Sequence, residues 1–120
     1  MTNPFADQKK FMVACDQSVD AYNAKQFDLY VNLINEEFEE LKAANGDKVE
    51  QLDALVDILV VAIGALHSLG VDSEGAWREV IRSNMSKVDP VTGKVIKRED
   101  GKVLKPATYS PPNLKPYVNT

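Results

Sequence analysis

The segment from about Asp47 to Leu69 constrains the fold most, because it is a long helical pattern that is apolar on nearly every side between Ala54 and Leu66. A helix that is hydrophobic all round has to be covered on more than one face. One acid, Asp57, stands inside its apolar run Leu55-Val56-Asp57-Ile58-Leu59-Val60-Val61, with no basic residue beside it. An ionised carboxylate in such surroundings is costly unless it is paired or binds a metal.

Three further helical patterns accompany this segment, at Lys9–Val19, at about Gln26–Ala44, and from Asp72 or Ser73 to Met85. The second pattern predicts one buried stripe, because its apolar positions recur three and four residues apart. These positions are Phe27, Tyr30, Val31, Ile34, Phe38 and Leu41. Four helices with short connections predict a bundle. A bundle this small, with one helix apolar all round, also predicts that a second subunit supplies cover.

The character of the chain changes after Lys87. Residues 94–98 and 102–105 predict two short strands joined at Glu99-Asp100-Gly101, where glycine tolerates a positive φ. Four prolines then predict an extended, non-helical tail. We therefore expect an all-α fold: a single domain over residues 1–120, with a four-helix-bundle-like core at about 9–87 and a C-terminal β-hairpin and extended tail at about 88–120.

Charge and cysteine content narrow the functional classes. Residues 1–81 carry 15 acidic and 6 basic residues, a balance of −9, whereas residues 82–120 carry 3 acidic and 8 basic residues, a balance of +5. The acidic part argues against nucleic-acid binding, and the division suits a metal–phosphate substrate. The longest apolar stretch, Ala54 to Leu66, is too short to cross a bilayer. A single cysteine, Cys15, and no visible signal peptide predict a cytoplasmic protein without a membrane partner.

Five carboxylates are the candidate metal ligands. Glu36, Glu37 and Glu40 lie at helical spacings on the second helix, and Asp53 and Asp57 lie four apart on the third. A solvated acidic face is the alternative for the glutamates alone. Acids converging from two helices would need cations, and oxygen-only ligands select hard ions such as Mg²⁺, with Mn²⁺ as a substitute. Magnesium sites commonly hold substrate phosphates, so a nucleotide or another polyphosphate is expected.

Candidate phosphate ligands lie at the end of the fourth helix, at Arg82, Asn84 and Lys87. The alternative for Arg82 is a surface ion pair with Glu74 or Glu79. The alternative for Asn84 and Lys87 is a helix cap and a lysine that complements the helix dipole. His67 is expected to be a satisfied interior histidine.

Four motifs in this order resemble the MazG-like all-α nucleoside triphosphate pyrophosphohydrolases. They are Glu36-Glu37-x-x-Glu40, Asp53-Ala54-Leu55-Val56-Asp57, Leu69-Gly70-Val71-Asp72 and Ser83-Asn84-Met85-Ser86-Lys87. The resemblance is closest to the branch that shares features with phosphoribosyl-ATP pyrophosphohydrolase and dimeric dUTPase. It departs from the family pattern at Ala54, where a glutamate is usual, which leaves Asp53 and Glu50 as alternatives for one ligand.

The resemblance implies Mg²⁺-dependent hydrolysis of a (deoxy)nucleoside triphosphate to the monophosphate and pyrophosphate, by a homodimer or homotetramer. Glu36, Glu37, Glu40 and Asp57 would hold the metal with Asp53 as a further ligand, and Glu37 would orient or deprotonate water. Arg82, Asn84, Lys87 and Lys102 would hold phosphates, and Gln17 would read the base. Candidate substrates are dUTP, dGTP or dATP, and noncanonical triphosphates. Phosphoribosyl-ATP is less expected, because an enzyme dedicated to it would not need this hairpin and tail. A non-catalytic module that binds a nucleotide or a partner protein is the alternative.

Overall fold

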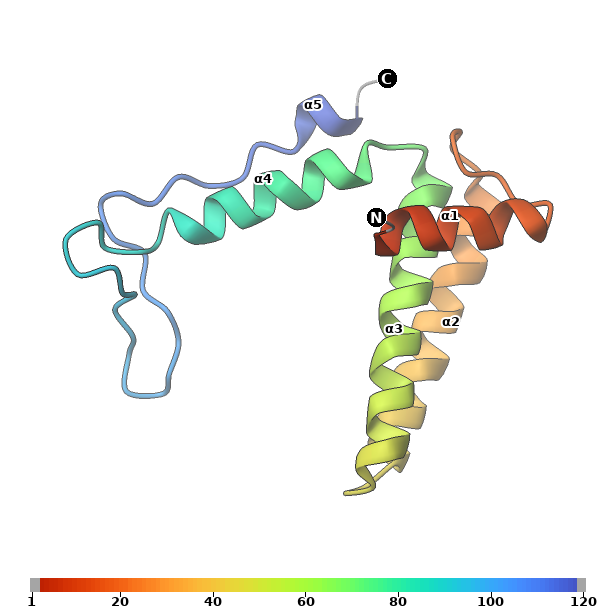
Figure 1. Ribbon diagram of the computed structural model, residues 1–120, viewed down its shortest axis with the longest axis horizontal. Coiled ribbons are helices and arrows are strands. Elements are labelled where there is room, and N and C mark those ends of the chain that lie inside the picture. The colour runs from red at the N-terminus through yellow and green to blue at the C-terminus, as the bar shows by residue number, and fades with distance from the viewer. Residues whose placement is uncertain (1–2, 119–120) are drawn as a thin grey trace. The chain divides into compact units, whose positions relative to one another are not determined.

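The computed structural model describes residues 3–118, and within them the regular structure is helical. The helices are α1 (Pro4–Ala14), α2 (Ala24–Ala43), α3 (Lys48–Leu69), α4 (Ser73–Met85) and α5 (Lys115–Val118) (Figure 1). The chain divides into two compact units, the first ending at Val71 and the second beginning at Asp72. The predicted all-α class is confirmed.

Helix α1 begins and ends about five residues earlier than the sequence pattern predicts. The Asn3 side chain accepts a hydrogen bond from the Ala6 amide at 2.8 Å, and Pro4 follows in the first helical turn, where its missing N–H costs nothing. Asp16 then adopts a positive φ of 58°, which stops the helix after Cys15. The prediction of Lys9–Val19 was wrong, because the N-cap at Asn3 and the positive φ at Asp16 set the ends of this helix, and apolar spacing indicates neither.

Helices α2 and α3 form an antiparallel pair and lie side by side (Figure 1). Asn45 and Gly46 turn the chain with positive φ angles, and the Asp47 carboxylate caps α3 by accepting from the Val49 and Glu50 amides. The core of this unit contains Met12, Tyr30 and Ala65, with Val19, Phe27, Leu33, Ile34 and Val61 packed against them. Half of the predicted α2 stripe therefore belongs to this core, namely Phe27, Tyr30 and Ile34, whereas Phe38 is 50% exposed.

A buried glutamine clamps the connection between α1 and α2. The Gln26 Oε1 accepts from the Ser18 amide at 2.9 Å, and its Nε2 donates to the Ser18 carbonyl at 2.7 Å and to Ser68 Oγ at 2.8 Å. Asn23 caps α2 by accepting from the Gln26 amide. His67 is buried, as expected, with its Nε2 2.9 Å from the Phe5 carbonyl.

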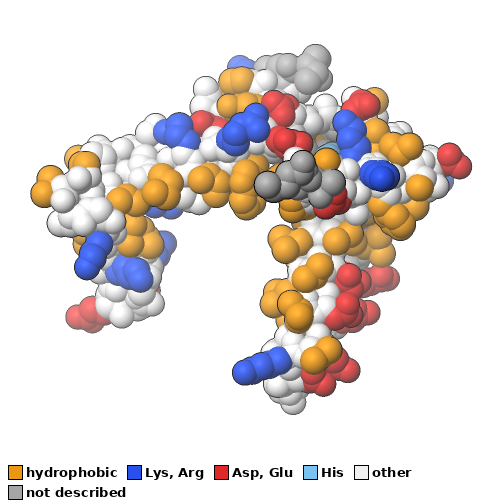
Figure 2. Space-filling view, in the orientation of Figure 1, with side chains coloured by type: hydrophobic (Ala, Val, Ile, Leu, Met, Phe, Trp, Pro, Cys, Tyr) orange, Lys and Arg blue, Asp and Glu red, His pale blue; other side chains and the backbone are white. Residues whose placement is uncertain are grey.

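Helix α3 keeps an uncovered apolar stripe within this chain. Leu52, Leu55, Val56, Leu59 and Val60 recur at helical spacing and are all exposed. Figure 2 shows hydrophobic side chains along one side of the α2–α3 pair and acidic side chains along another. By length and composition alone α3 could cross a membrane, with a mean hydropathy of 1.9 over 18 residues, although core helices of soluble proteins have the same properties.

The second unit is α4 with the following chain running back along it (Figure 1). Ser83 Oγ donates to the Ser110 carbonyl at 2.8 Å, the Asn113 amide donates to Glu79 Oε2 at 2.7 Å, and the Asp72 amide donates to the Tyr117 carbonyl at 3.0 Å. The register of these three bonds makes the tail antiparallel to α4.

The tail contains one helical turn, α5, where none was expected. Pro116 is its second residue, and a proline in the first turn of a helix loses no hydrogen bond. The expectation that four prolines exclude helix was therefore wrong at this point. Before it, Ala107 and Thr108 form a turn that the Tyr109 amide closes by donating to the Pro106 carbonyl at 3.0 Å, and residues 109–114 have no regular secondary structure.

The predicted β-hairpin is absent from the part of the chain that the structure describes. Lys97 and Val103 form one isolated antiparallel bridge, supported by the Arg98 amide donating to the Lys102 carbonyl at 2.8 Å. Gly101 does adopt the positive φ, 87°, that the turn requires. Two short, exposed segments without a third strand are marginal in water, which explains a turn without strands.

The predicted four-helix bundle is not tested by these two units. Three helices pack in the first unit, and α4 belongs to the second. The apolar spacing of α4 predicts that Trp77, Val80, Ile81 and Met85 face a core. In this structure Trp77, Ile81 and Met85 are 57%, 40% and 62% exposed. Membership of α4 in a bundle therefore stays a prediction.

Candidate metal centre

Three carboxylates meet between α2 and α3: Glu37 and Glu40 from α2, and Asp57 from α3. One oxygen of each lies within 4.8 Å of the others, and we call this group the acidic cluster. The two helices run antiparallel from a turn at Asn45-Gly46, so positions equally distant from the turn face one another. Glu37 and Asp57 are each ten residues from Asp47, which explains why they meet.

Within the acidic cluster, Glu37 is the carboxyl whose pKa is shifted. Its pKa is raised from 4.5 to about 7, first by loss of water around it and then by the adjoining Glu40 carboxylate. The charges of Asp57 and Asp53 raise the pKa further. Its Oε2 is buried without a hydrogen-bond partner within the described residues. A buried acceptor of this kind needs a proton donor or a cation.

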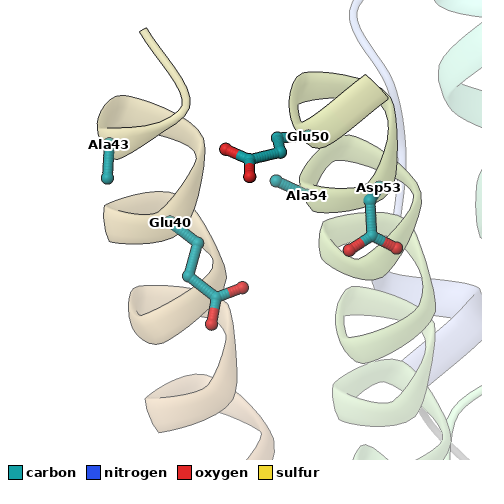
Figure 3. A pocket seen from close by; sticks show the side chains of 5 residues that line it. All are labelled: Glu40, Ala43, Glu50, Asp53 and Ala54. Carbon is teal, nitrogen blue, oxygen red and sulfur yellow. The ribbon is translucent and has the colours of Figure 1, made fainter. Parts of the chain in front are cut away.

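Ala54 stands where the family pattern usually has a glutamate, and its small side chain lines an open space between α2 and α3. Ala54 is buried, at 3% exposure, opposite Glu40 across the helix pair. A hollow of about 300 Å³ opens there, lined by Glu40, Ala43, Glu50, Asp53 and Ala54 (Figure 3). We call it the Ala54 hollow. Glu50 extends toward α2 at its end, so both acids proposed as alternative ligands line the same space.

Two predicted ligands lie outside the acidic cluster. Glu36 is exposed and precedes Glu37 by one residue, which turns its side chain about 100° around α2. Asp53 is exposed and acts on Glu37 through its charge. The structure thus groups three of the five predicted carboxylates closely and places Asp53 beside them.

The donor chemistry of the acidic cluster fits a hard divalent cation. Its side-chain donors are oxygens, no lysine or arginine within the described residues pairs with these three carboxylates, and one oxygen lacks any partner. Carboxylates held this close repel unless a proton or a cation intervenes. Glu37, Glu40 and Asp57 could hold such an ion, with Asp53 and Glu50 within the same region.

The predicted phosphate ligands belong to the second unit. Arg82 binds Glu79 with both ends of its guanidinium, at 2.7 and 2.9 Å, and donates to the Pro111 carbonyl at 3.2 Å. Arg82 and the Asn113 amide together lower the pKa of Glu79 to about 2. The pair with Glu79 is the alternative that the sequence offered for Arg82. The bond to the Pro111 carbonyl, which the sequence did not indicate, also fastens the tail to α4.

Lys87 and Lys105 lie on the same aromatic ring. Their Nζ atoms are 5.7 and 5.1 Å from the centroid of the Tyr109 ring, and Lys87 also donates to Asn84 Oδ1 at 3.3 Å. Lys102 is exposed, with its backbone engaged in the turn at Gly101. Lys105 was not among the predicted phosphate ligands. Its position four residues before Tyr109 was the signal in the sequence that could have indicated it.

Gln17 lies at an open hollow of about 480 Å³ in the first unit. Its Oε1 accepts a hydrogen bond from the Tyr30 hydroxyl. The hollow is lined by Gln17, Asn23, Lys25, Gln26, Asp28, Leu29 and Asn32, and we call it the amide hollow. Sequence reasoning named Gln17 alone. Asp28 and Asn32 gave a signal, because they precede Glu36 on α2 by eight and four residues and so share its face.

Carboxylates that converge from two antiparallel helices form the kind of site that can hold a metal ion for phosphate chemistry. The family model for phosphoribosyl-ATP pyrophosphohydrolase matches residues 11–84, more than half of the chain. The chain belongs to this family, within the MazG-like nucleoside triphosphate pyrophosphohydrolase superfamily. It is thus a nucleotide pyrophosphohydrolase domain, and the resemblance seen in the sequence is confirmed. A comparison with curated proteins found no match.

Proposed function

We propose that this protein hydrolyses a (deoxy)nucleoside triphosphate to the monophosphate and pyrophosphate in a Mg²⁺-dependent reaction. The observation that carries the proposal is the acidic cluster, with the raised pKa and unpartnered oxygen of Glu37. Family membership supports the pyrophosphohydrolase class. The free thiol of Cys15 is exposed, which supports a reducing cytoplasm as the location.

In the proposed reaction, a water oxygen forms a bond to the α-phosphorus and the bond to the bridging oxygen of the β-phosphate breaks. Pyrophosphate leaves, and the water proton passes to a carboxylate. Glu37 orients this water and accepts the proton, because its Oε2 has no other described partner. Glu37, Glu40 and Asp57 would hold the ion, Asp53 would add negative charge, and Glu36 is a further candidate ligand. When bound, Mg²⁺ would neutralise charge on the phosphates and activate water.

The proposal assigns phosphate binding to the basic second unit. Lys87, Asn84, Lys102 and Arg82 remain its candidate ligands, and Lys105 joins them because it shares the Tyr109 ring with Lys87. For Arg82 to bind phosphate, it would exchange the Glu79 carboxylate for a phosphate oxygen, which its fork geometry suits equally.

We further propose that the enzyme works as a homodimer or homotetramer. The exposed stripe Leu52, Leu55, Val56, Leu59 and Val60 supports this, because a contiguous apolar helix face in water is a typical interaction surface. A second copy also accounts for the cover that the apolar pattern of α3 demands.

The test is a screen of the canonical triphosphates, dUTP and phosphoribosyl-ATP, with products separated after incubation with Mg²⁺, with Mn²⁺ or with chelator. We expect pyrophosphate and a monophosphate in the metal-containing reactions alone. Glu40→Ala and Asp57→Ala are each expected to reduce turnover by at least about 100-fold, the scale of losing a group that stabilises a transition state.

Folding controls accompany these variants, because both positions lie between packed helices. Glu40→Gln and Asp57→Asn preserve shape and should melt normally while losing activity. Full turnover in any of the four would contradict the site. A wild-type protein that is stabilised by triphosphate with Mg²⁺ but releases no product would favour the non-catalytic binding module.

A further inference from the structure

We propose that Tyr109 is a positioning residue, whose ring holds Lys87 and Lys105 together as a pair of cations for the two terminal phosphates of the substrate. These phosphates are the part of the triphosphate that leaves as pyrophosphate. This inference rests on the proposed function, since it assigns the leaving group of the same reaction. We call Tyr109, Lys87 and Lys105 the tyrosine–lysine group.

The backbone on both sides of Tyr109 is hydrogen-bonded to the end of α4. Ser86 follows the last residue of α4, and its carbonyl accepts from Thr108 Oγ1 at 3.0 Å. The Ser86 hydroxyl accepts from the Ser110 amide at 2.8 Å, and the Tyr109 amide donates to the Pro106 carbonyl at 3.0 Å. The position of the ring is therefore set by hydrogen bonds that involve neither lysine.

Two lysines from separate parts of the chain contact this ring. Lys87 follows Ser86, and Lys105 precedes Tyr109 by four residues; their Nζ atoms are 5.7 and 5.1 Å from the ring centroid. The face of an aromatic ring carries partial negative charge, so it attracts an ammonium group at this distance. A free lysine side chain has many rotamers, and ordering it costs free energy on binding. A ring that orders both lysines in advance lowers that cost.

The two ammonium groups lack a negative partner in the part of the chain that the structure describes. Within residues 3–118, neither Lys87 nor Lys105 forms an ion pair. Lys87 also donates to a neutral acceptor, the Asn84 Oδ1, at 3.3 Å. Two like charges on one ring repel each other, and a bound anion would remove that cost. The tyrosine–lysine group therefore favours an anion that meets both cations at once.

A diphosphate matches two ammonium groups better than a single phosphate does. Because both Nζ atoms lie near one ring, they can be no farther apart than their two ring distances added together. Two linked phosphoryl groups carry more negative charge than one and can present oxygens to each lysine separately. In the proposed reaction negative charge builds on the departing pyrophosphate, and fixed cations beside it would stabilise that charge.

The experiment titrates inorganic pyrophosphate into the full chain in chelator at constant ionic strength, and follows the side-chain signals of Tyr109 and the lysines by NMR. We expect wild type to bind pyrophosphate more tightly than orthophosphate. Lys87→Met and Lys105→Met should each weaken pyrophosphate binding by about 10-fold or more, the scale of one lost charge-assisted hydrogen bond. Tyr109→Leu should weaken it by about 5- to 50-fold, because both lysines must then be ordered on binding.

Tyr109→Phe distinguishes positioning by the ring from a general loss of structure. It keeps the ring and its attraction for ammonium groups, so it should bind pyrophosphate as wild type does. In a chain that already carries Lys105→Met, Tyr109→Leu should cause a smaller loss than in wild type, because one lysine is left to order. Full additivity, or equal weakening in Tyr109→Phe and Tyr109→Leu, would overturn the role of the ring.

Two matched controls remove a ring or a charge elsewhere. Tyr22→Leu removes a tyrosine that is 65% exposed in the first unit. Lys94→Met removes an exposed lysine of the second unit that, among the described residues, contacts no aromatic ring. Both variants should bind pyrophosphate almost as wild type does. Equal weakening in Lys94→Met and Lys105→Met would mean that general positive charge, and not the tyrosine–lysine group, attracts the anion.

Other anions and nucleosides test which ligand the group takes. Orthophosphate binding as tightly as pyrophosphate, or no pyrophosphate binding by wild type at millimolar concentrations, would overturn the proposal. Deoxyadenosine carries no phosphate and should leave the Tyr109 ring signals unmoved. If it shifts them, the ring stacks on a base and the proposal fails.

The same titration separates this proposal from the proposed function, because it involves no hydrolysis. Pyrophosphate binding that depends on the Tyr109 ring supports the tyrosine–lysine group even if no triphosphate is cleaved. If triphosphates are cleaved, Tyr109→Leu should raise KM and Tyr109→Phe should restore it. Cleavage with an unchanged KM in Tyr109→Leu would overturn the assignment and leave the proposed function intact.

Discussion

Glu37 links the acidic cluster to the stability of the fold. Its pKa of about 7 in the folded chain lies above the ordinary value of 4.5, because burial and neighbouring carboxylates disfavour its charge. The folded protein therefore binds more protons than the unfolded chain between these values. By linkage, the free energy of unfolding must fall as pH rises through this interval.

We expect metal-free protein to lose stability from pH 4.5 to about 7, and Glu37→Gln to abolish most of that loss. Denaturant titrations in chelator across this interval measure it. Mg²⁺ should restore stability to the wild type at the upper end and much less to the variant. A metal-free stability that is flat or rises over the interval would contradict the raised pKa.

Gly64 is the second residue with a defined consequence, because it lets α3 approach the Tyr30 ring. A Cβ at position 64 would overlap the carbons of that ring. Gly64→Ala should therefore lower the free energy of unfolding by about 1–3 kcal/mol, as overpacking does in well-packed cores. Chemical denaturation measures the loss, and double substitution with Tyr30→Leu should recover part of it. Unchanged stability in Gly64→Ala would show that the two helices can separate freely there.

At the scale of elements, the α2–α3 pair decides which residues face one another. Counting outward from Asp47 pairs Glu37 with Asp57 and Glu40 with Ala54. The small side chain at position 54 leaves the Ala54 hollow beside three acids. Because the family pattern usually has a glutamate at position 54, the alanine here leaves a space that a longer side chain could occupy.

Ala54→Glu should add a fourth acid to the region of the acidic cluster. We expect a lower melting temperature in chelator than for wild type and a larger rise on adding Mg²⁺, because a cation relieves repulsion among the carboxylates. Ala54→Gln fills the same space without charge and should show neither effect. Equal responses to Mg²⁺ in both variants would mean that position 54 does not face the ion.

At the scale of the whole molecule, both units leave apolar side chains in water. The α3 stripe is exposed in the first, and Trp77, Ile81 and Met85 are exposed in the second. Soluble chains rarely keep contiguous apolar patches without a partner. The assembly of several copies proposed above would cover apolar side chains of this kind.

Leu59→Glu, in the middle of the α3 stripe at 62% exposure, should shift an oligomer toward monomer. Burying an unpaired charge in a subunit interface is strongly unfavourable. Sedimentation or light scattering across a dilution series measures the change. Val91→Glu introduces the same charge at a residue 91% exposed in the second unit and serves as the control. Identical masses for wild type and Leu59→Glu would exclude this stripe as the interface.

The sequence by itself determined the helices and the chemistry they carry. The bounds of α2, α3 and α4 agree with prediction to within two residues, because their caps and turns are local: Asn23, Asp47 and Asp72 each accept from amides within the next three residues. Local signals also located the acids on two neighbouring helices. The predicted bounds of α1 were wrong, because Asn3 and Pro4 start this helix before its apolar positions. The predicted hairpin was wrong, because its turn residues form a turn without flanking strands.

The tertiary structure alone decided which of these acids meet. Spacing could not separate Glu36 from Glu37, since one residue turns a side chain about 100° and only the packing of α3 selects a face. It also decided that Arg82 holds the tail through Glu79, and that Tyr30 orients Gln17 beside a hollow. These are contacts between residues distant in sequence, and periodicity along one helix carries no information about the element that packs against it.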